Sequence, residues 1–357
     1  MFAGERDAWD DLMNERVPQP HLRHSEPGFI GKILIIALVV ALIAAVWELQ
    51  LVFILGFGGV IVAVALYNLS APLAKRLHIS LHFAIALTTI GLGLVFIGFL
   101  AAFGARTAAQ FSALIDQLPG AWEATRAWLN SGGLGRWLLG IADSAASSAG
   151  NTIVSALPLA SGVLGWLANT GLILVIGIYL AMDSSTYLNG VLRLLPPAKR
   201  ERAGTIMYAA GADLRKWLVA MVLDMLFLGT VTGLLLWAVG APFPFPLAVL
   251  SGLSVFVPYV GPIIATIPGL LLALSVSPTL ALWAGGAYLI AQQLEGNISL
   301  PLLQRWTVQM PPVVSLLAIV AFGLLFGVWG VLLATPLAVV TMTVVRMAYV
   351  EDFLEKP

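Results

Sequence analysis

Apolar runs long enough to span a bilayer recur along this chain and restrict it to a membrane fold. A transmembrane helix needs about 20 apolar residues, and such runs begin near residues 30, 51, 81, 153, 218, 246, 280 and 313. Only 10% of the 357 residues are charged and 60% are hydrophobic, whereas about 25% of a soluble domain is charged. The sequence therefore predicts an all-α, polytopic integral membrane protein with about eight hydrophobic segments.

Two of these segments are interrupted by helix-breaking residues. Pro258, Gly261 and Pro262 lie inside the run 246–274, and Gly327 and Gly330 lie inside the run 313–345. Proline removes a backbone donor and clashes with the preceding turn. Within hydrocarbon such a break persists only where protein or a water-filled cavity satisfies the freed backbone groups. Broken helices at membrane depth indicate a transport site.

The two interrupted segments also resemble each other. Residues 261–268 (GPIIATIP) match residues 330–336 (GVLLATP). Each half-segment of about 12 residues rises about 18 Å as a helix, too little to cross about 30 Å of hydrocarbon. Each segment is therefore either one kinked span or a re-entrant hairpin, and two hairpins would form an inverted repeat. The residues expected to act as breaks or hinges are Pro258, Gly261, Pro262, Pro268, Gly327, Gly330 and Pro336.

The distribution of charge sets the expected organisation. With the N-terminus inside, the N-terminal tail, the loop after span two, the segment 193–216 and the C-terminal end carry four, two, six and two of the 18 Lys and Arg residues. Such a bias marks cytoplasmic segments, so both termini are expected to be cytoplasmic. The expected parts are a polar cytoplasmic tail (1–29), spans one to three (30–103), an extracytoplasmic amphipathic helical insert (104–151), span four (152–182), a basic cytoplasmic segment (183–217), a transport core (218–345) with breaks at 258–262 and 326–330, and a charged C-terminal tail (346–357).

A polar cluster follows the seventh apolar run. Glu295 lies beside Gln292, Gln293 and Asn297, and an ionisable group in or near a span is expensive and usually functional. The cluster is suited to bind a monovalent cation, relay a proton or contact a small polar solute. The alternative is an interfacial cap in which Gly296 and Asn297 end the helix.

A second carboxylate lies within the fifth span. Asp224 is surrounded in sequence by aliphatic residues and methionine, and a charge at such a depth costs about 2.5–3.5 kcal/mol on insertion scales. It is a candidate for proton or cation sensing, or else it pairs with a basic helix end. Tyr259 and Thr266, beside the first break, are candidates to face solute or ion or to satisfy freed carbonyl groups.

Several function classes are excluded or left without support. The formal net charge is zero, so no bulk attraction to nucleic acid is expected. There is no cysteine, which removes thiolate metal sites and thiol nucleophiles. No P-loop or G-x-S-x-G motif occurs, and these are the motifs of ATPases and serine hydrolases. We therefore expect no enzyme, no metal site and no cofactor beyond a coupling Na⁺ or H⁺.

The second half of the chain carries an ordered set of motifs. They are LRLLP at 192–196, VPYVGPII at 257–264, Ile267-Pro268, QLEGN at 293–297 followed by Pro301, MPP at 310–312, and GVWGVLLATP at 327–336. In these motifs the chain resembles the AI-2E family of bacterial inner-membrane transporters, also called the PerM or autoinducer-2 exporter family. The first 190 residues match mainly in their layout of spans.

The resemblance implies a protein of the bacterial inner membrane, usually drawn with eight spans. It implies export of autoinducer-2 or another small polar solute, or sodium/proton antiport, and does not choose between them. Our leading hypothesis is an ion-coupled exporter that works by alternating access within the bilayer. The alternatives are a sodium/proton antiporter and a non-transporting membrane scaffold. Small-residue motifs at Gly229/Gly233 and Gly323/Gly327 make a homo-oligomer plausible, and they also pack helices within one chain.

Overall fold

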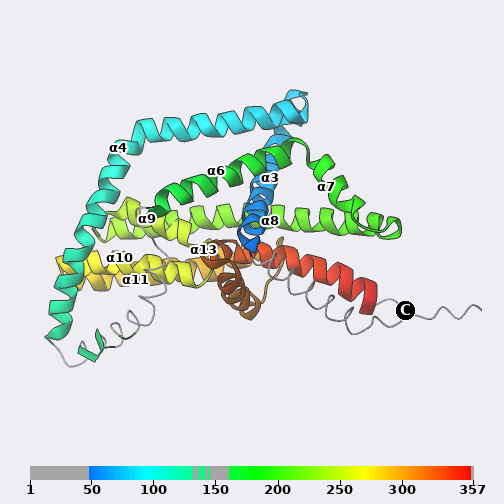
Figure 1. Ribbon diagram of the computed structural model, residues 1–357. Helices are drawn as coiled ribbons and strands as arrows, with labels where there is room; N and C mark the ends of the chain where they lie inside the picture. The colour runs from blue at the N-terminus through cyan, green and yellow to red at the C-terminus, as the bar shows by residue number, and fades with distance from the viewer. Residues whose placement is uncertain (1–47, 132–135, 138, 141–143, 145–160, 355–357) are drawn as a thin grey trace, which may run out of the picture. The chain divides into compact units, whose positions relative to one another are not determined.

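The computed structural model describes residues 48–131, 136–137, 139–140, 144 and 161–354 (Figure 1). The predicted tail, the first predicted span from residue 30 and most of residues 132–160 lie outside the described residues. Within the described part the chain is helical and contains no strand, which confirms the all-α prediction. In the described residues, each of the predicted hydrophobic segments after the first contributes a helix or a pair of helices. The helices are α3 (Gln50–Leu77), α4 (Leu81–Asn130), α6 (Ser161–Met182), α7 (Ser184–Arg193), α8 (Pro197–Ala238), α9 (Pro244–Ser254), α10 (Val260–Val276), α11 (Pro278–Leu294), η1 (Glu295–Ser299), α12 (Leu300–Gln304), α13 (Pro312–Val345) and η2 (Arg346–Leu354).

Several helices have the length and surface of membrane spans. Among the described residues, Gln50–Leu77, Pro197–Ala238 and Pro312–Leu354 are long and apolar enough to cross a bilayer. A fourth span is added if Leu167–Met182 and Ser184–Arg193, bent by 88°, count as one. Large apolar side chains on these and neighbouring helices are exposed, for example Leu324 at 79% and Trp237 at 71%. Apolar exposure on this scale suits lipid rather than water, so the chain is a polytopic membrane protein.

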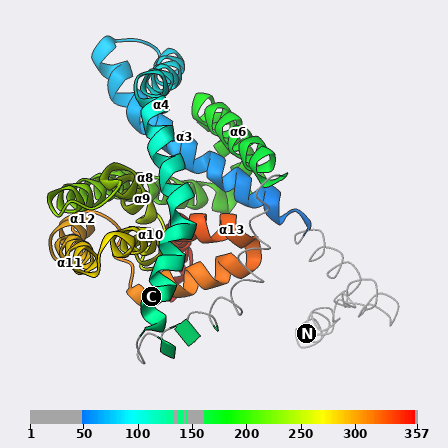
Figure 2. The same cartoon turned by 90° about the vertical axis from the view of Figure 1, so that its left-hand side faces the viewer.

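Helix α4 continues past the boundary that the sequence suggested at residue 103, and Figure 1 shows it bent along its length. It is one helix from Leu81 to Asn130, and its C-terminal half packs on the later part of the chain. Figure 2 shows α4 crossing α9 and α10, and buried Leu114 and Ala121 join a cluster with Leu247 and Leu272. The amphipathic pattern after residue 104 therefore covers the expected transport core.

Glycines bring α3 and α6 into close contact. A Cβ added at Gly59 would overlap the side chain of Ile176, and one at Gly58 would lie 3.1 Å from Ile173. From the other helix, a Cβ at Gly177 would lie 2.5 Å from Val62. In lipid, packing of small residues replaces the hydrophobic driving force between helices.

One of the two small-residue motifs that suggested an oligomer, Gly229/Gly233, is used within the chain. A Cβ at Gly229 would lie 3.1 Å from the carbonyl oxygen of Ala248, and one at Gly252 would lie 2.6 Å from that of Met225. Gly233 faces Ala248 in the same way. These contacts join α8 to α9, so this motif is already satisfied without a second copy.

The first break lies slightly earlier than the sequence suggested. Helix α9 ends at Ser254 and α10 begins at Val260, so the interruption is 255–259 rather than 258–262. Tyr259 has φ 65° and ψ −48°, and the Val260 N–H donates to the carbonyl of Pro258 at 2.7 Å. This is the rare γ-turn with positive φ, a strained conformation for a residue other than glycine. Pro262 falls in the first turn of α10, where a missing N–H costs nothing.

The second break falls at Gly327, as the sequence predicted. Gly327 has φ 62° and ψ −143° and divides α13 into two helical halves, a conformation open essentially only to glycine. Figure 2 shows the chain turning back within α13 (orange to red). Pro268 and Pro336 were expected as hinges, but both lie inside continuous helix.

The two breaks are built alike. A Cβ at Gly261 would overlap the carbonyl oxygen of Ser254, and a Cβ at Gly330 would overlap that of Phe322. These glycines are equivalent in the internal repeat, and each lets the helix after a break pack against the one before it. Phe256 and Phe326, from the two breaks, pack against one cluster that includes buried Leu333.

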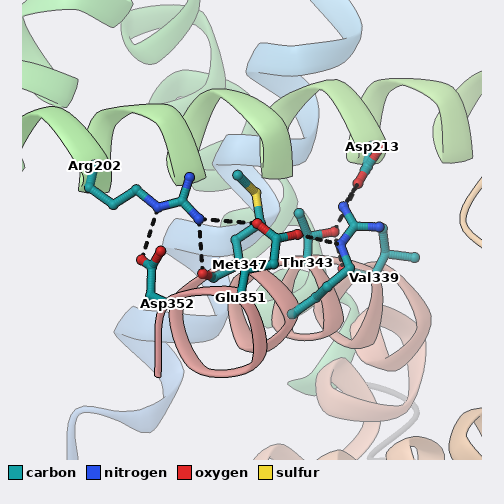
Figure 3. A network of polar contacts seen from close by, with 8 residues as sticks. Arg202, Asp213, Val339, Thr343, Met347, Glu351 and Asp352 are labelled. Carbon is teal, nitrogen blue, oxygen red and sulfur yellow. Dashed lines mark hydrogen bonds and ion pairs between the residues drawn. The ribbon is translucent and has the colours of Figure 1, made fainter. Parts of the chain in front are cut away.

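A polar network that we call the C-terminal clasp ties the end of the chain to α8 (Figure 3). Arg202 Nε donates to Asp352 Oδ2 at 2.9 Å, and its Nη2 donates to Glu351 Oε2 at 3.1 Å and to the Met347 carbonyl at 3.0 Å. Residues 346–354 of the predicted charged tail therefore form a docked helical segment, η2.

The same surface contains a second set of contacts around Asp213. Its carboxylate accepts a hydrogen bond from Thr343 Oγ1 at 3.0 Å and faces Lys216 Nζ at 3.5 Å and Arg346 Nη2 at 3.8 Å. The basic segment 193–216 and the C-terminal end thus lie together, as their expected location on one side of the membrane requires.

The paired glycines predict a matched stability series. Gly261→Ala and Gly330→Ala should each lower the melting temperature of the detergent-solubilised protein, because overpacking against backbone costs about 1–3 kcal/mol. Gly286→Ala in α11 is the control, since a Cβ there meets nothing within 4 Å. Equal melting temperatures for all three variants would contradict this account of the breaks.

The clasp predicts a local effect of Arg202→Gln. Loss of its contacts should speed amide hydrogen exchange across residues 346–354, because η2 depends on them for docking. Arg305→Gln removes the same charge from an exposed side chain without a hydrogen bond or ion pair in the described structure. Unchanged exchange in Arg202→Gln would show that the clasp does not hold η2.

Candidate functional site

A cavity of about 310 Å³ lies among the helices from α8 to α13. Its walls come from α8, the first break, the start of α10, the end of α11, η1, α12, the loop 305–311 and both halves of α13. The polar residues that line it are Asp224, Tyr259, Gln292, Glu295, Gln304, Thr307, Ser315 and Thr335. The remainder of the lining is largely apolar, including Trp217, Met221 and Val339.

Asp224 reaches the cavity from the middle of α8. Its side chain is only 6% exposed, and its Oδ1 accepts a hydrogen bond from Ser299 Oγ at 2.5 Å. A hydroxyl that donates to a buried carboxylate offsets part of its desolvation cost. The partner is thus a neutral hydroxyl rather than the basic helix end that was the alternative.

Glu295 reaches the same cavity through a π-helical turn. Helix α11 continues without a cap into η1, so Gly296 and Asn297 do not end the helix. Within η1, Glu295 and Ser299 are buried while Gly296 and Asn297 are exposed. Single π-helical turns inside α-helices occur frequently at functional sites. Here the turn directs two polar side chains to one face.

The charge of the cavity is one-sided. Asp224 and Glu295 line it from different elements, and none of the described lining residues is Lys, Arg or His. Two like charges in a low-dielectric space repel strongly, so the arrangement favours a bound proton or a cation between them.

The structure brings together four of the seven predicted contact residues. Glu295, Asp224, Gln292 and Tyr259 line the cavity, as do the break residues Pro258 and Pro262.

The other predicted contact residues lie elsewhere. Asn297 Nδ2 donates to the Gln293 carbonyl at 2.8 Å and to Gln293 Oε1 at 2.9 Å, and both residues are exposed. They occupy the opposite face of the helix from Glu295. Thr266 Oγ1 donates to the Pro262 carbonyl at 2.8 Å, so it satisfies backbone at the break and is not among the cavity-lining residues.

Sequence reasoning missed four hydroxyl residues of the site, Ser299, Thr307, Ser315 and Thr335. Ser299 lies four residues after Glu295, and a helical face count from Glu295 would have found it. Thr335 is the repeat equivalent of Thr266, and this alignment was the available signal. Ser315 lies in an apolar run without a distinguishing neighbour, and only the fold of α13 brings it to the cavity.

Comparisons with known proteins agree with this architecture. The family model described as AI-2E family transporter matches residues 35–349. The chain is 32% identical over 185 residues to "Putative transport protein YrrI" of Bacillus subtilis (strain 168), which covers 52% of each protein. It is 32% identical over 170 residues to "Putative permease PerM" of Escherichia coli (strain K12), covering 47% of this chain and 48% of that protein.

The matched segments thus span about half the length of these relatives. The family model, in contrast, runs through nearly all the described helices and contains both breaks and the whole cavity. The chain therefore belongs to the AI-2E family of transporters.

Proposed function

We propose that this protein is an ion-coupled secondary transporter that exports a small polar solute, similar to autoinducer-2, by alternating access. The observation that carries the proposal is the convergence of Asp224 and Glu295 on one cavity beside a broken helix. Intramembrane carboxylates are costly, and they mark ion and substrate pathways. A volume of about 310 Å³ lies at the small end of ligand sites, which suits a small solute or an ion.

The two breaks supply the moving parts of this mechanism. Each interrupts a segment whose two halves pack closely at a glycine, Gly261 or Gly330, and Phe256 and Phe326 from the two breaks pack on the Leu333 cluster. Two re-entrant hairpins that enter from opposite faces and meet near the midplane would give the inverted-repeat geometry of several secondary transporters. Movement of one hairpin at a time would expose the cavity to one side.

The coupling role falls to the two carboxylates. Among the described lining residues, the titratable groups are Asp224, Glu295 and Tyr259. A carboxylate with no basic partner binds a proton or cation in one state and releases it when the cavity rehydrates. Gln292 and Tyr259 would contact the solute through neutral hydrogen-bonding groups.

Sodium/proton antiport is the second candidate function. It is favoured by the absence of basic side chains among the described lining residues, since such a cavity suits cations alone. In an antiporter, sodium and protons would compete for Asp224 and Glu295, and no organic solute would be needed.

We place the protein in the bacterial inner membrane with both termini in the cytoplasm. The joint position of the basic segment and η2 in the C-terminal clasp supports a common side for them. We retain a homo-oligomer as part of the proposal, although the Gly229/Gly233 motif is used within the chain.

A flux assay in proteoliposomes tests the transport proposal. Asp224→Asn and Glu295→Gln should each reduce ion-coupled flux at least tenfold, because each removes a titratable group from the cavity. Glu201→Gln, an exposed carboxylate outside the cavity, is the matched control. The panel should include sodium, protons and small polar solutes, and solute-independent sodium/proton exchange would favour the antiporter. Full activity in both cavity variants would sink the proposal.

The absence of cysteine allows a direct test of the hairpins. Val260 lies at the first break and Val328 at the second, and their side chains are similarly exposed, at 39% and 38%. Each is replaced in turn, as Val260→Cys and Val328→Cys. Opposed hairpins predict labelling of the two positions from opposite sides of right-side-out and inside-out vesicles by a membrane-impermeant maleimide. Labelling from the same side, or of neither residue, would contradict the inverted repeat.

A further inference from the structure

The internal repeat places two threonines in equivalent positions with different bonding. Thr266 follows Gly261 by five residues, and Thr335 follows Gly330 by five. Thr266 Oγ1 donates to the carbonyl four residues earlier, that of Pro262, at 2.8 Å. Thr335 Oγ1 is buried without a hydrogen-bond partner, and the residue is only 6% exposed. The repeat therefore satisfies one hydroxyl and leaves the other unsatisfied.

The unsatisfied hydroxyl belongs to the functional cavity. Thr335 lines it together with Asp224 and Glu295, whereas Thr266 does not line it. A buried hydroxyl without a partner destabilises the structure. Rotation about χ1 exchanges the hydroxyl and methyl positions of threonine, so the hydroxyl can turn toward the cavity without movement of the backbone. A ligand in the cavity would then recover the missing bond.

The surroundings of Thr335 indicate what kind of ligand this is. Ser315, buried at 7% exposure, lines the cavity from the other half of α13. With Asp224 and Glu295, the site presents oxygen atoms from α8, η1 and both halves of α13, and its described lining has no basic side chain. Carboxylate and hydroxyl oxygens are typical ligands of hard cations. A proton needs only one carboxylate, whereas a dehydrated metal ion needs several oxygens.

We propose that Thr335 is a ligand residue for a dehydrated sodium ion, which its hydroxyl, Asp224, Glu295 and Ser315 hold inside the cavity. The inference rests on the proposed transport function and deepens it by naming the coupling ion. The second broken segment thereby senses the ion directly, because Ser315 and Thr335 lie on either side of the Gly327 break.

Equilibrium binding of ²²Na⁺ to the purified, full-length protein in detergent tests the proposal. Thr335→Val removes the hydroxyl and keeps the shape of the side chain, and it should weaken sodium binding about three- to tenfold. Thr335→Ser keeps the hydroxyl and should bind within about twofold of wild type. Thr266→Val is the matched control from the equivalent repeat position and should not change sodium affinity.

Melting temperature separates a binding role from a structural one. Because the Thr335 hydroxyl has no partner, Thr335→Val should not lower the melting temperature and is expected to raise it slightly. A variant that is at least as stable as wild type but binds sodium more weakly supports the proposal. Unchanged sodium binding in Thr335→Val overturns it, and so does a destabilised Thr335→Val protein whose affinity loss is shared by Thr266→Val.

The outcomes also distinguish this inference from the transport proposal. If wild type shows flux that depends on Glu295 but no saturable ²²Na⁺ binding, the sodium site is overturned and proton-coupled transport stands. If wild type shows no flux of any kind, the transport proposal itself fails. Sodium binding that depends on Thr335 without any flux would support the site and reject its assigned transport role.

Discussion

The burial of two carboxylates among apolar helices is the constraint on which the rest of this core depends. Asp224 and Glu295 are 6% and 8% exposed, and a charge at membrane depth costs about 2.5–3.5 kcal/mol even on insertion scales. Three features reduce that cost. The Ser299 hydroxyl bonds Asp224, the π-turn directs Glu295 into a cavity rather than into lipid, and the cavity has room for a proton or ion. Glu295 therefore lies on irregular backbone, whereas Asp224 lies within the regular helix α8.

The cost of burying polar groups also explains why the two breaks depend on glycine. A helix that stops at membrane depth leaves backbone groups without partners, so the chain must return at once and pack against itself. Gly261 and Gly330 permit this return because each lies against a carbonyl oxygen that any Cβ would overlap. Thr266 then satisfies the carbonyl of Pro262. At the first break, a hydrogen bond to the backbone and close helix packing thus occur within a few residues of each other.

Much of this organisation could be predicted from the sequence, but not its details. The lengths of the apolar runs, the positions of proline and glycine, and the similarity of residues 261–268 to residues 330–336 indicated where the helices and both breaks lie. The first break was predicted about three residues too late. Gly261 and Pro262 are the residue types expected to break a helix, but the turn is made by Tyr259. Asn297 and Gln293 were grouped with Glu295 because they are close to it in sequence. In the helix they lie on the exposed face, opposite the buried side chain of Glu295. Ser315 reaches the cavity only through tertiary folding.

The two halves of the repeat differ where they touch the cavity, and the difference has a physical meaning. The second break uses Gly327, which adopts positive φ without strain. The first uses Tyr259, whose positive φ costs about 1–3 kcal/mol and whose side chain lines the cavity. A strained turn in contact with a ligand can be stabilised or released by that ligand, whereas an unstrained glycine hinge moves without such a bias. Under the proposed function, a ligand would act on the first break through the strained turn at Tyr259 and on the second segment through Ser315 and Thr335, so the two breaks would respond to it by different means.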